Sequence, residues 1–401
     1  MKQFEQTSVI NVDYECDVCV CGGGIAGIAA ALSAVREGKR VILLERSYML
    51  GGLATAGLVT IYLPLCDGEG NQVSFGIAEE LLKLSIVYGA EDRYPKPWLE
   101  GGTMEEKRET RYQVRYNAQL FAIKAEELLV NEGVKIIYGA TCASVRVEDQ
   151  RITHVVIEGK SGKQAVEVGM SVIDTTGDAD ICHRSGAKTA IYHNGEGNVL
   201  AAWYYKYFEG NFDLKMLGYC ENPDPKKSAK PLVKRRYTGV ETEELSEMMQ
   251  DSHKALLNDI DRERSAHPDI VPTTISTIPQ TRMTRRLVGA YTVDESEVFK
   301  SFSDSVGLFS DWRNRGPVFE LPFRTLYSED IKNLYAAGRC MSVTDPMWDI
   351  TRVIPVCAVT GEAAGLAATM ASEASAVNVA ELQAKLIKRG VKLKCSDIKK
   401  V

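Results

Sequence analysis

The fold is decided by one stretch, Asp17-Val18-Cys19-Val20-Cys21-Gly22-Gly23-Gly24-Ile25-Ala26-Gly27. It opens with a short apolar run that has no helical period, and an alanine-rich segment follows it. This order predicts a strand, a tight glycine turn and a helix. Gly22, Gly24 and Gly27 fit the pattern G-x-G-x-x-G. Its first glycine permits the turn, its second lets a pyrophosphate approach the backbone, and its third packs the helix on the strand.

A second apolar strand over residues 40–44 supports a nucleotide-binding interpretation. It ends in Glu45, about twenty residues beyond the glycine motif, where a carboxylate is placed to accept hydrogen bonds from ribose hydroxyls. The same negative charge disfavours a nucleotide with a 2′-phosphate. The sequence therefore predicts an α/β fold with a Rossmann-like parallel sheet and a dinucleotide site.

Composition indicates an ordinary folded protein. The 401 residues include 48 basic and 54 acidic side chains, a net charge of −6 with no long basic run, which disfavours nucleic acid as the main partner. Hydrophobic residues at 45% and charged residues at 25% match globular proteins and exclude disorder. The length allows two or three structural units.

Two apolar runs, Cys16–Val35 and Pro355–Ser372, are the candidates for a membrane span or a signal peptide. The first contains Asp17 and lacks a basic leader, and the second carries Glu362 in its middle. We therefore expect no membrane partner and a cytoplasmic protein whose ten cysteines are mostly reduced.

The cysteines Cys16, Cys19 and Cys21 have the spacing C-x2-C-x-C, which could suggest a metal or iron–sulfur site. They alternate with valines in the predicted first strand, whose neighbouring side chains point to opposite faces. We therefore expect small buried residues here, and no metal.

Glu45-Arg46 is followed by Leu50-Gly51-Gly52-Leu53-Ala54-Thr55. This continuation resembles the FAD-dependent oxidoreductases of the glutathione-reductase-like, two-dinucleotide-binding superfamily, and within it a broad family of mostly unassigned bacterial enzymes. The resemblance implies FAD as the cofactor.

Later segments extend the resemblance. Residues 172–180 read as a strand running into a Thr-Gly-Asp turn, and residues 333–339 as another strand ending in Gly338-Arg339. Arg352-Val353 precedes a helix of small residues, whose N-terminus can direct its dipole at the flavin or the pyrophosphate. In relatives, backbone near residues 141–143 contacts the adenine. The residues expected to bind FAD are Gly22, Gly24, Ile25, Ala26, Gly27, Glu45, Arg46, Gly52, Leu53, Ala54, Cys142, Ala143, Thr176, Gly177, Asp178, Gly338, Arg339, Arg352, Val353 and Ala363.

The scattering of these motifs predicts a discontinuous FAD-binding domain. We expect it to comprise residues 1–65, 115–190 and 330–375, with a β-meander inserted over 141–173. A mixed α+β substrate domain would comprise 66–114 and 191–329, and 376–401 a C-terminal helical tail.

Three local features are predicted outside the motifs. A helix over 117–131 presents Leu120, Ile123, Leu128 and Leu129 on its apolar face. Thr238-x-x-Glu241 is predicted as a capping box before a helix, and 221–236 as an exposed loop.

Candidate catalytic residues lie in the second half of the chain. Arg282-Met283-Thr284-Arg285-Arg286 concentrates guanidinium groups just before a strand expected over 287–293, in a region where relatives carry a similar motif facing the substrate. A substrate carboxylate could pair with Arg285 or Arg286, although pairing with nearby acids is the alternative. His193 is a candidate proton carrier. Many relatives have Ser-His after the Gly-Arg turn, and Asp345 would have to take that role here.

The leading hypothesis is an oxidoreductase that transfers a hydride between flavin N5 and a small, anionic organic substrate, with an unidentified electron acceptor. A flavin-bearing isomerase or lyase without net redox change is one alternative, and a non-catalytic dinucleotide-binding module is another. Whether the chain forms oligomers is left open.

Overall fold

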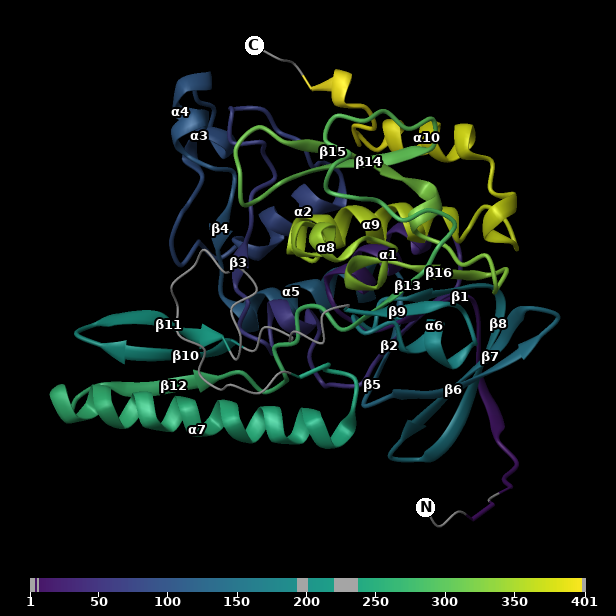
Figure 1. The fold of residues 1–401 in the computed structure, drawn as a ribbon, viewed down its shortest axis with the longest axis horizontal. Coiled ribbons are helices and arrows are strands. Elements are labelled where there is room, and N and C mark those ends of the chain that lie inside the picture. Colours follow the sequence, from purple (N-terminus) through teal and green to yellow (C-terminus); the bar gives the residue numbers. More distant parts are fainter. Residues whose placement is uncertain (1–3, 6, 193–200, 220–236, 399–401) are drawn as a thin grey trace.

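A seven-stranded sheet carries the fold (Figure 1). The computed structural model describes residues 4–5, 7–192, 201–219 and 237–398. The strand order is β5-β2-β1-β8-β7-β6, with β16 also paired to β8. The strands are β1 (Asn11–Cys21), β2 (Val41–Glu45), β5 (Lys135–Tyr138), β6 (Thr141–Glu148), β7 (Arg151–Gly159), β8 (Gly162–Asp174) and β16 (Leu334–Ala336). The predicted α/β fold, parallel sheet and inserted meander are confirmed.

The strands β5, β2, β1, β8 and β16 run parallel, and their carboxyl ends meet at one edge. Cys21 pairs with Leu44 of β2 and Asp174 of β8, and Asp174 pairs in turn with Ala336. The first part of β8 pairs with β7 in the antiparallel meander. Segments far apart in the sequence therefore end side by side.

Each face of this sheet is covered by a different layer. Helices α1 (Ile25–Val35) and α9 (Ile354–Ala367) share one apolar core with Val18 and Val20 of β1. On the other face, Cys19 and Cys21 pack with the meander and the short helix α6 (Asp180–Arg184). The first strand is thus apolar on both faces, as its unbroken hydrophobic run predicts.

The cysteines of β1 lie inside this second layer. The sulfurs of Cys19 and Cys21 are 3.9 Å apart, and both side chains are fully buried. Within the described part of the chain, no group of three or more His, Cys, Asp or Glu side chains is arranged to hold a metal ion. The motif C-x2-C-x-C contributes apolar packing here.

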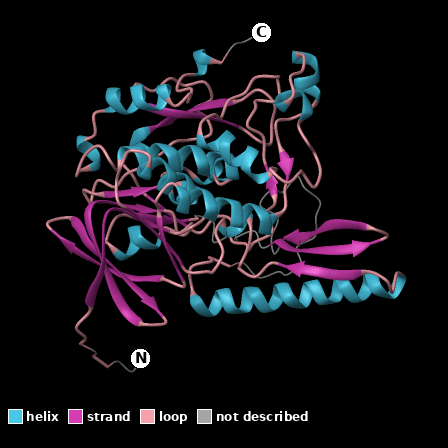
Figure 2. Ribbon diagram, turned by 180° about the vertical axis from the view of Figure 1, so that it is seen from behind, coloured by secondary structure: helices cyan, strands magenta, loops and turns pink. Residues whose placement is uncertain are grey.

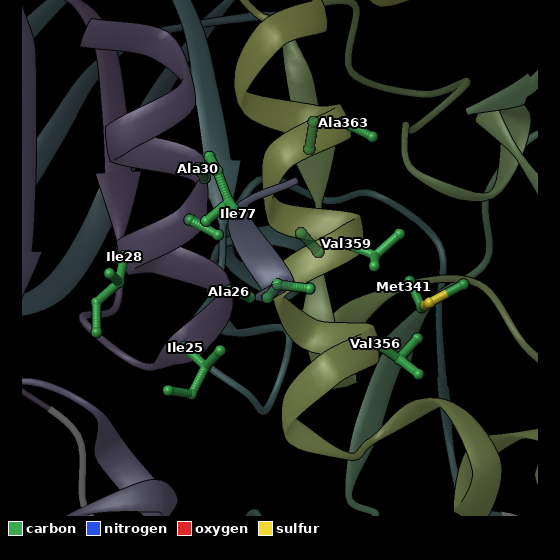
Figure 3. Close-up of a cluster of buried hydrophobic side chains, with 14 of the residues drawn as sticks. Ile25, Ala26, Ile28, Ala30, Ile77, Met341, Val356, Val359 and Ala363 are labelled. Carbon is green, nitrogen blue, oxygen red and sulfur yellow. The ribbon is translucent and has the colours of Figure 1, made fainter. Parts of the chain in front are cut away.

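Helices α1 and α9 approach closely because α9 presents glycines to α1. A Cβ built on Gly361 would lie 2.3 Å from the carbonyl oxygen of Ala26, and one on Gly365 2.3 Å from that of Ala30. Figure 3 shows the two helices side by side. The Ser33 hydroxyl also donates to the carbonyl of Glu362 at 2.8 Å.

The remaining elements pack around this centre or form a projecting arm. Packed around it are α2 (Ile77–Ser85), α3 (Lys96–Leu99), α4 (Met104–Glu109), α5 (Ala118–Asn131), α8 (Asp345–Thr351), α10 (Val379–Lys388), β3 (Ile61–Tyr62), β4 (Val114–Arg115), β9 (Thr189–Ile191), β13 (Arg285–Leu287), β14 (Ser305–Ser310) and β15 (Val318–Pro322). The arm consists of β10 (Ala201–Phe208), β11 (Asn211–Tyr219), β12 (Val271–Ile275) and the long helix α7 (Thr242–Ala266), which lies along the three strands (Figures 1 and 2).

The predicted domain division remains a proposal. The packing does not separate its segment 66–114 from the central core. Ile77, Leu81 and Leu82 of α2, from the segment 66–114 assigned to the substrate domain, belong to the same apolar core as α1 and α9. The arm has small apolar clusters of its own. The arm is therefore the part of 191–329 that is most separate from the central core.

Three local predictions need correction. Helix α5 exists, but Leu120 and Ile123 are exposed and its buried face carries Phe121, Ala122 and Ala125. Glu241 forms no capping box, because the side chain of Glu244 accepts the hydrogen bonds from the Thr238 backbone and hydroxyl.

The strand expected over 287–293 instead occupies Arg285–Leu287, so Arg285 and Arg286 lie within the strand. The predicted loop 221–236 lies outside the described residues.

No single helix in the described ranges is both long and apolar enough to cross a membrane. Helices α8 and α9 meet those criteria only as a pair, with a bend of 93° between them.

Candidate active site

A pocket opens at the edge where the carboxyl ends of the parallel strands meet, with a cavity of about 270 Å³. Crevices at this edge of an open α/β sheet are the usual ligand sites of such folds. Its walls come from the turns after β1, β2, β8 and β16, the start of β6, the start of α9, β3, and residues 278–282. Segments from across the whole sequence thus form one site.

The glycine turn after β1 owes its shape to three different requirements. Gly22 has a φ of +110°, a conformation that side chains disfavour. A Cβ on Gly27 would lie 1.8 Å from the carbonyl oxygen of Gly22, whereas a Cβ on Gly24 would meet no atom of the described residues within 4 Å. Thr175 holds the turn, since its hydroxyl donates to the carbonyls of Cys21 and Gly22. Gly24 therefore faces open space in the pocket.

Glu45 is buried at the end of β2 and lines the pocket. One carboxylate oxygen accepts a hydrogen bond from the backbone N–H of Gly23 at 2.7 Å, and the other accepts one from that of Ser47 at 2.7 Å. Each carboxylate oxygen can accept a further bond. The side chain thus fixes the glycine turn and still has capacity for a ligand's hydroxyls.

The turn after β8 is organised by the buried carboxylate of Asp174. It accepts hydrogen bonds from the Thr176 backbone and hydroxyl and from the Cys182 backbone. Burial raises the pKa of Asp174, while these bonds oppose the shift. The Cys340 sulfur accepts from the backbone N–H groups of Gly177 and Ala179, which joins this turn to the one after β16.

Arg339 connects the sheet edge to residues 278–282. Its guanidinium donates to the carbonyls of Thr281 and Arg282 at 3.0 and 3.2 Å and lies 3.4 Å from Asp178. A Cβ on Gly177 would lie 2.3 Å from this guanidinium, so the glycine leaves room for it. Arg339 therefore holds one wall of the pocket in place.

Two helices begin at the pocket without a side-chain cap. Gly24 is the N-cap of α1 and Val353 that of α9, and among the described residues no side chain caps either helix start. The first N–H groups of a helix need acceptors, and the helix dipole favours an anion there. Ile25 and Ala26 of α1 and Ile354 of α9 line the cavity. The pocket thus suits a ligand with negative charge and several acceptor oxygens.

Comparison with known proteins identifies the family. A model of FAD dependent oxidoreductases matches residues 17–209 and 201–386. The chain belongs to the FAD-dependent oxidoreductase family.

Individual relatives are distant. Thioredoxin reductase of Ureaplasma parvum serovar 3 is 36% identical over 78 residues, which are 19% of this chain and 25% of that protein, so the match spans a quarter of the relative.

Similar solved structures include a geranylgeranyl bacteriochlorophyll reductase-like protein from Thermoplasma acidophilum. It is 15% identical, with 94% of this chain and 84% of that one covered and a TM-score of 0.49. A 3-ketosteroid-delta4-(5alpha)-dehydrogenase from Rhodococcus jostii is 14% identical, with 90% and 98% covered and a TM-score of 0.38.

The cofactor of this FAD-dependent oxidoreductase is FAD, and the pocket fits it. Open space at Gly24 and the uncapped start of α1 suit a pyrophosphate, and the buried carboxylate of Glu45 suits ribose hydroxyls. The structure shows these features in one continuous pocket.

Most residues predicted to bind FAD line the pocket. They are Gly22, Gly24, Ile25, Ala26, Glu45, Arg46, Gly52, Leu53, Ala54, Cys142, Thr176, Gly177, Gly338, Arg339, Arg352 and Val353. Gly27, Ala143, Asp178 and Ala363 are not among its lining residues. Gly27 and Asp178 contact the lining residues Gly22 and Arg339 without lining the pocket themselves. Ala363 packs in the core, because α9 begins at Ile354 and Ala363 therefore lies well inside the helix.

Arg285 and Arg286, the predicted catalytic arginines, are not among the lining residues of the pocket, and both have protein partners. Arg285 is 2.7 Å from Asp180, and Arg286 is 2.9 Å from Asp345 and stacks on Trp348. Burial lowers the pKa of Arg286, and the carboxylate of Asp345 opposes that shift. Both arginines thus have carboxylate partners within the protein, and a catalytic role for Arg285, Arg286 or Asp345 stays a prediction. His193 lies outside the described residues.

Sequence reasoning missed several lining residues. Val59, Ile61 and Leu63 supply an apolar wall, and Cys357 supplies a thiol. Arg282 also lines the pocket, as the first residue of the predicted arginine cluster. Loss of hydration raises the pKa of the Cys357 thiol to about 11, so it stays protonated at neutral pH. Cys357 could have been found, because it lies about one helical turn beyond the predicted Val353.

Proposed function

We propose that this FAD-dependent oxidoreductase transfers a hydride between flavin N5 and a small, anionic organic substrate, and exchanges electrons with a second, unidentified molecule. FAD supplies the two-electron chemistry when it is bound. The observation that carries the proposal is the single pocket in which a nucleotide-binding edge continues into an apolar wall with Arg282. A nucleotide site alone would not need that wall.

The residues of the chain would share the work of binding and orientation. Glu45 holds the adenosine ribose, and the start of α1 binds the pyrophosphate. The start of α9 would offer free N–H groups to the pyrimidine edge of the flavin or to the pyrophosphate. The apolar side chains Val59, Ile61 and Leu63 exclude water beside the reacting ring.

The absorbance spectrum of purified protein tests the proposal. We expect a yellow protein that releases FAD on acid precipitation, and whose colour a substrate bleaches anaerobically and an acceptor restores. Bound FAD with turnover but no net bleaching would instead indicate an isomerase or lyase. Bound FAD that no reductant or substrate changes would indicate a binding module, and a protein without any flavin would contradict the proposal.

A further inference from the structure

The apolar wall of the pocket is built on a two-stranded ribbon. Val59, Ile61 and Leu63 line the pocket. Thr60 lies between them in the chain, is fully buried and is not among the lining residues. Strand β3 pairs with β4, with Ile61 opposite Arg115. A ribbon of two strands is marginally stable by itself, so the position of the wall depends on the groups that hold the ribbon from behind.

Tyr205 of β10 connects the arm to this ribbon. Its hydroxyl oxygen lies 2.9 Å from that of Thr60, and its hydroxyl donates to the carboxylate of Glu91 at 2.7 Å. A hydroxyl has one proton and a carboxylate only accepts, so Thr60 donates to Tyr205 and Tyr205 donates to Glu91. Loss of hydration raises the pKa of Tyr205, and the negative charge of Glu91 adds to that rise, so the hydroxyl keeps its proton at neutral pH.

Glu91 is itself anchored to the ribbon. Its backbone N–H donates to the carbonyl of Arg115 in β4 at 2.9 Å. The carbonyl of Thr60 accepts a hydrogen bond from the backbone N–H of Tyr116, the residue after β4, at 3.2 Å. The Tyr205 hydroxyl therefore joins β10 to a residue held by β4 and to the residue that precedes β3. One hydroxyl thus links the arm to both strands of the ribbon.

The arm also meets the pocket at two other places. Trp203 of β10 packs with Val59, and its ring centroid lies 5.1 Å from the guanidinium carbon of Arg282, which lines the pocket as Val59 does. After β12, the backbone N–H of Thr277 donates to the carbonyl of Ala56 at 3.0 Å, and the next two residues line the pocket. The arm thus projects from the molecule (Figure 1), but its inner end is packed against the wall.

We propose that Tyr205 is a positioning residue of the reaction site. Its hydroxyl, bonded to Thr60 and Glu91, holds residues 59–63 in place beside the flavin, so the arm sets the shape of the wall that the reacting ring meets. Tyr205 acts through Thr60, since it is not itself among the lining residues. This inference rests on the proposed function, because the wall adjoins the flavin only when the pocket holds FAD.

Hydrogen exchange and visible circular dichroism of the FAD-loaded protein test this role. Tyr205→Phe removes the hydroxyl and keeps the ring, and Thr60→Val removes the partner hydroxyl. Each should speed exchange of the peptide that spans residues 59–63 by severalfold to about tenfold, the effect of one lost hydrogen bond. Each should also change the visible circular dichroism of bound FAD, which reports the groups around the flavin. Thr60→Ser keeps the hydroxyl and should match the parent in both measurements.

Two comparisons make the test specific. Tyr207→Phe is the matched control, because Tyr207 lies two residues farther along β10 and is 40% exposed, and it should match the parent. The double variant Tyr205→Phe/Thr60→Val should exchange no faster than the faster of the two single variants, because both changes break the same link.

Faster exchange with an unchanged flavin signal in Tyr205→Phe would show that the hydroxyl only stabilises the fold, and would overturn the positioning role. Unchanged exchange in Tyr205→Phe, effects that multiply in the double variant, or Thr60→Ser behaving like Thr60→Val would also overturn it. Each of these results, obtained with yellow protein, leaves the proposed function standing. Protein without flavin would overturn the proposed function and this inference with it.

Discussion

Gly24 and Gly27 lie on the same turn, but they lack side chains for different reasons. A Cβ on Gly27 would collide with the carbonyl of Gly22, and a Cβ on Gly24 would enter only the space left for the cofactor. The first glycine therefore serves the protein's own packing and the second serves its ligand.

Alanine substitutions should separate these roles. Gly27→Ala should lower the free energy of unfolding of the FAD-free protein by about 3 kcal/mol or more, since the overlap involves backbone atoms. Gly24→Ala should cost about 1 kcal/mol or less, as expected at an N-cap, yet weaken FAD binding at least about tenfold. Urea unfolding and titration of flavin fluorescence measure the two effects. Equal losses of stability in both variants would contradict this distinction.

Glu45 should contribute to FAD affinity through the charge of its carboxylate. In Glu45→Gln one of the two acceptors for Gly23 and Ser47 is replaced by an NH2 group, and the bond to the ribose weakens. Hydrogen bonds to charged groups contribute about 1.5–3 kcal/mol, so FAD should dissociate at least about tenfold more readily. Glu158→Gln, an exposed position on the meander, is the control. Unchanged flavin retention after dialysis of Glu45→Gln would refute the assignment.

At the scale of elements, the sequence predicted those helices, strands and turns that are determined by neighbouring residues. The strand, turn and helix at residues 17–35 follow from an apolar run, glycines and alanines, and α5 begins after Asn117, whose side chain caps it. The buried face of α5 could not be read this way. Its packed residues are largely alanines, and the elements packed against them decide their burial.

The same limit applies to the arginine cluster. Arg282, Arg285 and Arg286 look equivalent in sequence. Their roles depend on Asp180, Asp345 and Trp203, which the fold brings from other segments.

Helix α9 carries a buried acid that should make stability depend on pH. Glu362 is 3% exposed, accepts a hydrogen bond from the Ile77 backbone at 2.8 Å, and has its pKa raised by burial to about 7. Arg36 and Arg389 oppose this shift and Glu80 adds to it. The folded protein therefore takes up a proton that the unfolded chain, with a pKa near 4.5, releases.

Glu362→Gln should remove this dependence. The free energy of unfolding of the parent, relative to the variant, should be highest below pH 4.5 and should fall as the pH rises through 7. The total fall should be ~3 kcal/mol, because each unit of difference between the folded and unfolded pKa of Glu362 corresponds to about 1.36 kcal/mol. Urea unfolding of both proteins between pH 4 and pH 8 measures the difference. A constant difference across that range would show that Glu362 titrates normally.

At the scale of the whole molecule, the sequence contains a single G-x-G-x-x-G motif followed by a ribose-binding acid. We therefore expect NADH to reduce the flavin slowly, because the motif that could bind its nucleotide is the one assigned to FAD. Stopped-flow absorbance under anaerobic conditions measures the rate. Rapid, saturable bleaching at micromolar NADH would contradict the prediction.

The arm should open more readily than the central sheet. Among the described residues its apolar clusters are small, whereas β1 and α1 belong to large, buried clusters. Regions with few buried apolar contacts open at lower free energy. Hydrogen exchange should therefore be faster in β10 and α7 than in β1 and α1. Equal protection in both regions would indicate that the arm and the sheet unfold together.

The packing of α1 against α9 also has a consequence for synthesis on the ribosome. The Ser33 hydroxyl bonds to the carbonyl of Glu362, 329 residues later in the chain. At 5–20 residues per second, α1 is made roughly 15–65 s before its partner helix. During that interval the apolar face that α9 will cover is exposed, and the FAD pocket lacks the wall that α9 provides. Chaperone contact with the nascent chain, and cofactor loading only after α9 emerges, are the expected results.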